Sequence, residues 1–79
     1  MLDELSSGAK VVGLKQLRKA LSNGTAKKVF LAEDADPALV EPIAQQCAEA
    51  NIAVVYVPTM KQLGDACRIS VAAAAAAIV

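Results

Sequence analysis

The chain of 79 residues contains no histidine and no tryptophan, and Phe30 and Tyr56 are its only aromatic residues. Without histidine, neither a Ser–His nor a Cys–His nucleophilic pair can form. Two cysteines alone do not supply the usual ligands of a zinc site. Two aromatic residues do not make a stacking surface for a single strand of nucleic acid. We therefore expect a protein that is not an enzyme, with no catalytic residues, no metal and no cofactor.

The sequence also lacks a secretory signal and an apolar run of membrane length. Its start, Met1–Leu5, is acidic and has no apolar h-region. The tail from Ile69 to Val79 holds about ten apolar residues, whereas a helix needs about 20 to cross a bilayer. We expect a cytoplasmic protein with no membrane contact. Its two cysteines, Cys47 and Cys67, should be reduced and buried as small hydrophobic side chains.

The length and the 56% content of hydrophobic residues predict a single domain over residues 1–79. Short β-rich apolar runs alternate with segments of helical spacing. This alternation predicts an α/β fold with helices on both faces of one sheet. The expected order is helix 2–9, strand 11–13, helix 14–22, strand 29–32, helix 37–50, strand 52–57, helix 59–67 and a final segment from residue 72.

The final segment admits two interpretations because Ala72–Ala77 is a run of six alanines. Intrinsic propensity assigns alanine to a helix, but a helix of about eight residues is marginal on its own. The preceding alternation of strands and helices predicts a further strand. Ile78 and Val79, which end the segment, are β-branched residues that favour a strand. We favour the strand, over which small side chains would let a helix pack closely.

Local signals predict where the helices begin and end. Asn23–Gly24 is a typical C-terminal signal, and Asp36 before Pro37 is typical of an N-cap. Thr59 with a glutamine three residues later has the spacing of a capping box. The acidic residues from Glu33 to Asp36 could instead bind magnesium, but capping and solvation explain them more simply.

The charged residues are sorted along the chain although the formal net charge is zero. Between Lys10 and Lys28 every charged residue is basic, and from Glu33 to Glu49 every charged residue is acidic. A positive surface region of this kind attracts phosphate groups. The basic stretch comprises Lys10, Lys15, Arg18, Lys19, Lys27 and Lys28.

Within this stretch, Gly13 lies between a predicted strand and the start of a predicted helix. Free N–H groups at a helix start favour phosphate oxygens, and glycine permits close approach of a backbone. Lys15, Gln16 and Lys19 fall on the exposed side, where they could bond to base edges or phosphates. On these residues alone, a second interpretation remains open: the helix face is simply exposed to solvent and binds no ligand. No G-x-x-x-x-G-K-[ST] or G-x-G-x-x-G motif indicates a nucleotide site.

Four groups of residues agree in order and spacing with one protein family. They are Val12–Gln16 with Lys19 and Asn23–Gly24, Val29–Pro37, Lys61–Cys67, and Ile69–Ala72. This set resembles the kink-turn-binding ribosomal-protein family of the L-seven-Ae type, and its short bacterial members in particular. The resemblance covers the chain from about Ala9 to Val79. It is specific as a set, although no single motif is diagnostic.

The resemblance implies a three-layer α-β-α sandwich with a four-stranded mixed sheet that ends in a strand. It also implies a non-enzymatic protein that recognises and stabilises kink-turns in structured RNA, ribosomal or riboswitch-like. Kink-turns are sharply bent internal loops with tandem sheared G·A pairs and one flipped-out nucleotide. The bend exposes guanine edges that regular A-form RNA hides. We expect a monomer that is associated with the ribosome and does not bind DNA.

The resemblance also implies roles for individual residues. Gly13 would pack closely against the RNA, Lys15 and Gln16 would face the G·A pairs, and Lys19 would contact the same region. Asp36 would lie near the flipped-out base, and Val40 would make an apolar contact. The complete set of implied RNA-binding residues is Gly13, Leu14, Lys15, Gln16, Arg18, Lys19, Lys28, Asp36, Val40, Arg68, Ile69, Ser70 and Val71.

The sequence departs from the family pattern in both RNA-facing segments. Lys15 and Gln16 stand where archaeal and eukaryotic relatives commonly have asparagine and glutamate. In the second segment, Arg68 replaces a common glycine and Val71 replaces a common arginine, which removes one possible phosphate contact. This loss and the neutral net charge leave open a protein-interaction or scaffold module of the same fold. A small phosphate- or nucleotide-binding α/β enzyme is a third alternative.

Overall fold

The computed structural model describes residues 9–79, so the helix expected near the start of the chain lies outside the described residues. In these residues, strands and helices alternate in the expected order, which confirms the α/β class. The elements are β1 (Lys10–Val12), α2 (Leu14–Asn23), β2 (Lys28–Ala32), α3 (Pro37–Glu49), β3 (Ala53–Val57), α4 (Met60–Ala66) and β4 (Ala75–Ile78).

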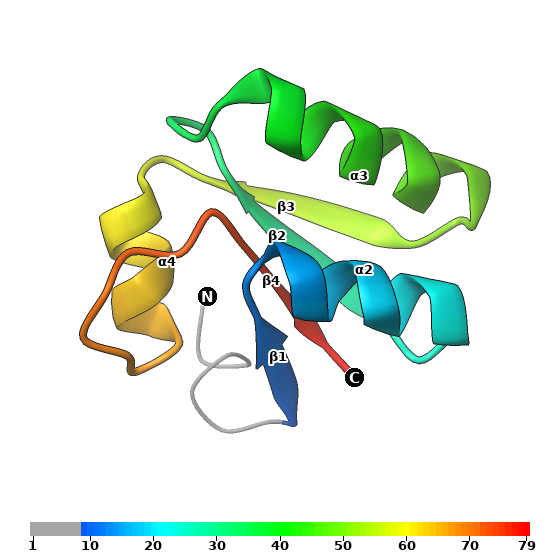
Figure 1. Cartoon of the computed structure of the whole chain (residues 1–79), viewed down its shortest axis with the longest axis horizontal. Helices are drawn as coiled ribbons and strands as arrows, with labels where there is room; N and C mark the ends of the chain where they lie inside the picture. The colour runs from blue at the N-terminus through cyan, green and yellow to red at the C-terminus, as the bar shows by residue number, and fades with distance from the viewer. Residues whose placement is uncertain (1–8) are drawn as a thin grey trace.

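The four strands form one mixed sheet in the order β1-β4-β2-β3. Strands β2 and β3 are parallel, whereas β4 is antiparallel to both of its neighbours, β1 and β2. Helices α2 and α3 pack together on one face of the sheet, and α4 lies on the other face (Figure 1). The three-layer α-β-α sandwich with a four-stranded mixed sheet is therefore confirmed.

The alanine-rich tail forms the central strand β4, as we favoured. Ala75, Ala76 and Ala77 are fully buried between β1 and β2, with Ala76 opposite both Val12 and Phe30. Helices α2 and α4 both contact this strand, from opposite faces of the sheet. Small side chains are required there because a larger one would push a helix away from the sheet. The demands of packing on both faces thus override the helical propensity of alanine.

The expected helix ends are confirmed by their hydrogen bonds. Gly24 closes α2 in the left-handed conformation, with φ 71°. The Asp36 carboxylate accepts a bond of 2.9 Å from the Ala38 N–H at the start of α3. The Thr59 hydroxyl accepts a bond of 3.0 Å from the Gln62 N–H in α4. No group of side chains between residues 9 and 79 is arranged to hold a metal ion.

Both cysteines belong to the hydrophobic core, as expected. Cys47 is 0% exposed and Cys67 is 2% exposed. Burial raises the pKa of both thiols, and the nearby Lys10 ammonium partly offsets this effect on the pKa of Cys67. None of the helices in the described part of the chain has the length and hydrophobicity needed to cross a membrane.

Candidate nucleic-acid interface

The three described helices all begin at the same edge of the sheet. Strands β1, β2 and β3 run in the same direction, so their carboxyl ends lie at this edge and α2, α3 and α4 begin there. The chain also enters β4 at this edge, where the Gly13 N–H donates to the Ala75 carbonyl at 2.9 Å. We call this the helix-start edge, formed by residues 13–16, 33–38, 58–61 and 71–74.

Gly13 leaves an uncovered stretch of backbone at the helix-start edge. Its φ of 97° and ψ of 154° lie in a region that other residues rarely adopt. Among the described residues, nothing lies within 4 Å of the place where a Cβ would stand. The glycine is therefore required by its own conformation rather than by crowding inside the protein. The open space beside it lets a ligand approach the backbone closely.

The start of α2 differs from the starts of the other two helices. Asp36 caps α3 and Thr59 caps α4, but no described side chain caps α2. As in α3 and α4, the first turn of α2 contains no acidic side chain. Unbonded N–H groups at a helix start carry a partial positive charge that favours anions. The start of α2 is consequently the part of this edge best suited to a phosphate group.

The side chains that follow on α2 extend this positive region. Lys15, Gln16, Arg18 and Lys19 are all exposed, whereas Leu17 is fully buried and anchors the helix to the core. Leu14, also predicted to face RNA, is only half-buried and packs against the core. The structure therefore brings the four polar residues that α2 contributes to the predicted set together on one exposed helix face beside Gly13.

The start of α3 presents a different chemistry. Asp36 is exposed, but its carboxylate is already bonded to the Ala38 N–H, and Glu33 and Glu41 lie nearby. Val40 is largely buried and reaches the surface only in a hollow that Tyr56 also lines. Acidic groups repel phosphates. This half of the edge therefore suits a neutral group, such as a nucleobase, better than an RNA backbone.

Sequence analysis did not single out two residues near this edge. Tyr56 is 52% exposed and lies on β3 between Val55 and Val57, which line a groove on the α4 face, whereas Tyr56 faces α3. Tyr56 is the one residue with a polar group in an otherwise apolar strand, and this could have indicated from the sequence that its side chain is exposed. Lys61 is exposed in the first turn of α4. Its position just after the Thr59 cap placed it at a helix start, beside the second predicted RNA-facing loop.

The second predicted RNA-facing segment, residues 68–71, reaches the edge only in part. Arg68, Ser70 and Val71 are exposed, and Ile69 is half-buried. Arg68 follows the last turn of α4, about 10 Å along the helix axis from the edge at 1.5 Å per residue. The chain then returns, and the Ala73 N–H bonds to the Met60 carbonyl at 3.0 Å. Val71 thus lies nearer to the helix-start edge than Arg68 does.

Lys28 lies at the edge of the sheet that is opposite the helix-start edge. It begins β2, opposite Ala53 and Ile78, and Lys10 of β1 is also opposite Ile78. A strand of this length separates Lys28 from the helix-start edge by about 13 Å. The Lys28 ammonium lies 5.6 Å from the centre of the Phe30 ring. The structure thus divides the basic stretch between two edges, and an RNA contact of Lys28 stays a prediction.

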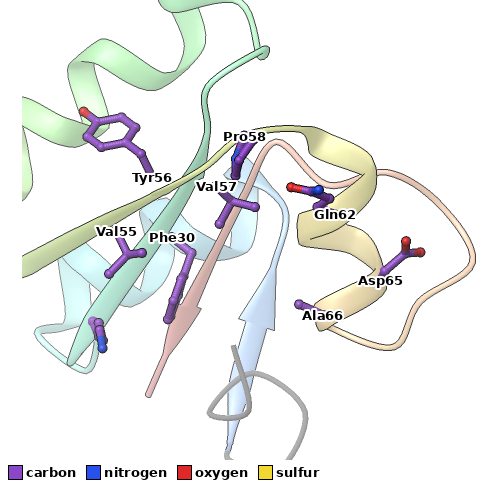
Figure 2. Close-up of a pocket in the computed structure, with 9 residues that line it drawn as sticks. Phe30, Val55, Tyr56, Val57, Pro58, Gln62, Asp65 and Ala66 are labelled. Carbon is purple, nitrogen blue, oxygen red and sulfur yellow. The ribbon is translucent and has the colours of Figure 1, made fainter. Parts of the chain in front are cut away.

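A mostly apolar groove lies on the α4 face of the sheet (Figure 2). Phe30, Val55 and Val57 form its floor, and residues of α4 form one wall. Lys28 is the only member of the predicted RNA-binding set that lines it. Among residues 9–79, its charged lining is one basic residue, Lys28, and one acidic residue, Asp65, which does not suit a polyanion.

The fold and this edge define a class of small α-β-α sandwich proteins that present a helix start and an adjoining loop at one sheet edge. A model of the ribosomal protein L7Ae/L30e/S12e/Gadd45 family matches residues 3–79, and the chain belongs to this family. The motifs identified in the sequence therefore indicated the correct family.

Similar proteins support this assignment. The chain is 48% identical over 75 residues to an RNA-binding protein of Geobacillus sp. (strain WCH70), covering 95% of this chain and 92% of that protein. It is 47% identical over 74 residues to RNA-binding protein YbxF of Geobacillus stearothermophilus, covering 94% and 90%. These relatives are named as RNA-binding proteins and not as enzymes.

A solved structure shows the same fold. The 15.5kD RNA binding protein of Giardia lamblia superimposes with a TM-score of 0.89 at 29% sequence identity, covering 98% of this chain and 68% of that chain. A protein of unknown function from Bacillus halodurans C superimposes with a TM-score of 0.86 at 23% identity, covering 98% and 81%. The second likeness concerns the fold alone.

Proposed function

We propose that this chain is a non-enzymatic RNA-binding protein that recognises and stabilises kink-turns, in ribosomal or other structured RNA. The observation that carries the proposal is the uncapped start of α2 behind Gly13, flanked by the exposed Lys15, Gln16 and Lys19. The relatives named as RNA-binding proteins support it. We also propose that the protein acts as a monomer in the cytoplasm.

The start of α2 would bind the bent RNA backbone and the exposed base edges together. A kink brings phosphates close to one another, which costs electrostatic energy in the free RNA. The free N–H groups of α2 and the charges of Lys15, Arg18 and Lys19 would offset this repulsion. Gln16 would bond to guanine or adenine edges, because its amide both donates and accepts hydrogen bonds. Gly13 would let the RNA approach without collision.

The acidic start of α3 would receive the flipped-out nucleotide rather than a phosphate. Val40 and the hollow beside it provide an apolar contact, while the engaged carboxylate of Asp36 repels the backbone. A protein with these two halves binds the kinked RNA and not a regular duplex. It therefore shifts the RNA population toward the bent state.

The proposal is tested by calorimetric titration of a kink-turn RNA against the same RNA with its G·A pairs replaced by Watson–Crick pairs. We expect binding to the intact RNA at least about 100-fold tighter, because the altered RNA does not present the kink. Equal affinity for both RNAs, or no binding to either, would contradict the proposal. Copurification with a protein partner that survives nuclease treatment, without RNA binding, would instead support the scaffold alternative.

A further inference from the structure

We propose that Asp34 and Gly64 are positioning residues that hold the loop of residues 68–74 in the shape that binds RNA. The inference rests on the proposed RNA-binding function and identifies how one part of that site is kept in place. Neither residue belongs to the predicted RNA-binding set. Both act through the backbone of α4 and of the loop that follows it.

Asp34 connects the start of α3 to the start of α4. Its carboxylate oxygen Oδ1 accepts a hydrogen bond of 2.8 Å from the Met60 N–H, which is 26 residues away in sequence. The Met60 carbonyl then accepts a bond of 3.0 Å from the Ala73 N–H. A continuous path of two hydrogen bonds therefore runs from Asp34 to the chain just after Val71. Both bonds lie at the helix-start edge.

Gly64 holds the same loop from the middle of α4. It is buried, and a Cβ at this position would collide with the carbonyl oxygen of Val71. The Gly64 carbonyl also accepts a bond of 3.1 Å from the Ile69 N–H, and the Asp65 carbonyl accepts one of 3.0 Å from the Arg68 N–H. The loop, drawn in orange, doubles back along α4 (Figure 1). Its backbone is thus fixed at both ends and in the middle.

These contacts matter because α4 is too short to hold the loop by itself. A helix of 7 residues is marginal alone, so tertiary contacts decide where it lies. A loop ordered in advance spares RNA binding the entropy cost of ordering it. If the loop is released, only a fraction of the molecules can bind, and the apparent affinity falls by that fraction.

Asp34 permits a test in which electrostatics and positioning predict opposite results. A negative charge at an edge that faces RNA should weaken binding. If charge were its only role, Asp34→Ala would tighten RNA binding. If Asp34 positions α4 and the loop, Asp34→Ala should weaken binding by about five- to tenfold, because the Met60 N–H loses its acceptor. Asp34→Asn keeps an acceptor without the charge and should restore affinity to wild type or better.

The experiment measures the affinity of a kink-turn RNA for the wild type, Asp34→Ala, Asp34→Asn, Gly64→Ala and the control Asp65→Asn. Asp65→Asn removes an exposed charge of α4 outside the helix-start edge but keeps the backbone bond from the Arg68 N–H to the Asp65 carbonyl, so we expect equal or tighter binding. Gly64→Ala should weaken binding without any change of charge. Because both changes release one loop, their combination should cost less than the sum of the single effects.

Amide hydrogen exchange in the RNA-free protein provides a readout that does not depend on the proposed function. Asp34→Ala should speed exchange at Met60 and Ala73 while the core strands stay protected. If Asp34→Ala does not fold, Gly64→Ala serves in its place, because release of the loop should speed exchange at Ile69 and Ala73.

Unchanged exchange, or wild-type affinity in Asp34→Ala and Gly64→Ala, would overturn the inference while leaving RNA binding intact. A wild type that binds no RNA would refute the proposed function instead, and the exchange rates would still test the loop contacts.

Discussion

Backbone conformation at single residues distinguishes two kinds of constraint in this protein. Gly13 has φ 97° at an open surface, whereas Arg68 has φ 61° at the end of α4. Arg68 follows the C-cap residue Cys67, and its N–H and that of Ile69 bond back to α4. This is the hydrogen-bond pattern of a Schellman motif, in which glycine is usual. Arginine there carries the strain of a left-handed conformation.

Arg68→Gly should therefore stabilise the protein. We expect the free energy of unfolding to rise by about 1 kcal/mol, since glycine adopts positive φ without the steric cost of a Cβ. Urea denaturation monitored by circular dichroism measures the change. Ser70→Gly is the control, because Ser70 has no positive φ and glycine there should not stabilise. A lower stability of Arg68→Gly would show that the arginine side chain makes a contact that outweighs the strain.

At the scale of elements, β4 shows how packing limits the choice of residue. Ala77 is fully buried opposite Val11 and Val29 in the middle of the sheet. Ala77→Leu should lower the free energy of unfolding by about 1–3 kcal/mol, because the added atoms have no space between the sheet and its helix. The urea midpoint should fall with an unchanged m-value. Ala48→Leu on the exposed face of α3 is the control, and an equal effect there would contradict this explanation.

Helix α2 and the opposite edge of the sheet should contribute unequally to RNA affinity. Lys19 is exposed on the cationic face of α2, whereas Lys27 precedes β2 at the other edge. Lys19→Ala should weaken kink-turn binding severalfold and reduce the slope of log K against log salt by about 0.7–0.9, the loss of one phosphate contact. Lys27→Ala should change both quantities less. Titration at four salt concentrations decides this, and equal effects of the two changes would refute the placement of the site.

At the scale of the molecule, the order of the elements and the fold could be predicted from the sequence alone. Periodicity marked the helices, and caps such as Asp36 and Gly24 marked their ends, because these signals are local. The strand formed by the alanines could be predicted only from the alternation of strands and helices along the whole chain. The edge of the sheet at which Lys28 lies could not be predicted, since it depends on the direction in which β2 runs relative to β1.

The contacts that complete the site also escaped sequence analysis. The bond from the Met60 N–H to Asp34 joins residues 26 positions apart, and no local pattern indicates such a contact. The distance of Arg68 from the helix-start edge depends on the length and direction of α4. Residues near one another in sequence could thus be grouped correctly, but distant segments could be placed only by the folded chain.

The zero net charge of the molecule hides a division of its surface into a basic part and an acidic part. The start of α2 is positive and uncapped, while the starts of α3 and α4 are capped by their own side chains. Of the three helix starts in residues 9–79, the start of α2 is therefore the one left to attract phosphates. Under the proposed function, a regular duplex would meet the acidic half as well, whereas a kink would direct its phosphates toward α2 and a single base toward α3.

The measurement that tests this account most directly is fluorescence energy transfer across a kink-turn RNA labelled at its two ends, titrated with the protein without magnesium. Saturating wild-type protein should convert the RNA to the high-transfer, bent state, because binding selects that state. The same RNA with its G·A pairs replaced should keep low transfer at equal protein concentration. Low transfer in both RNAs, or an equal rise in both, would contradict the central claim that the helix-start edge recognises kinked RNA.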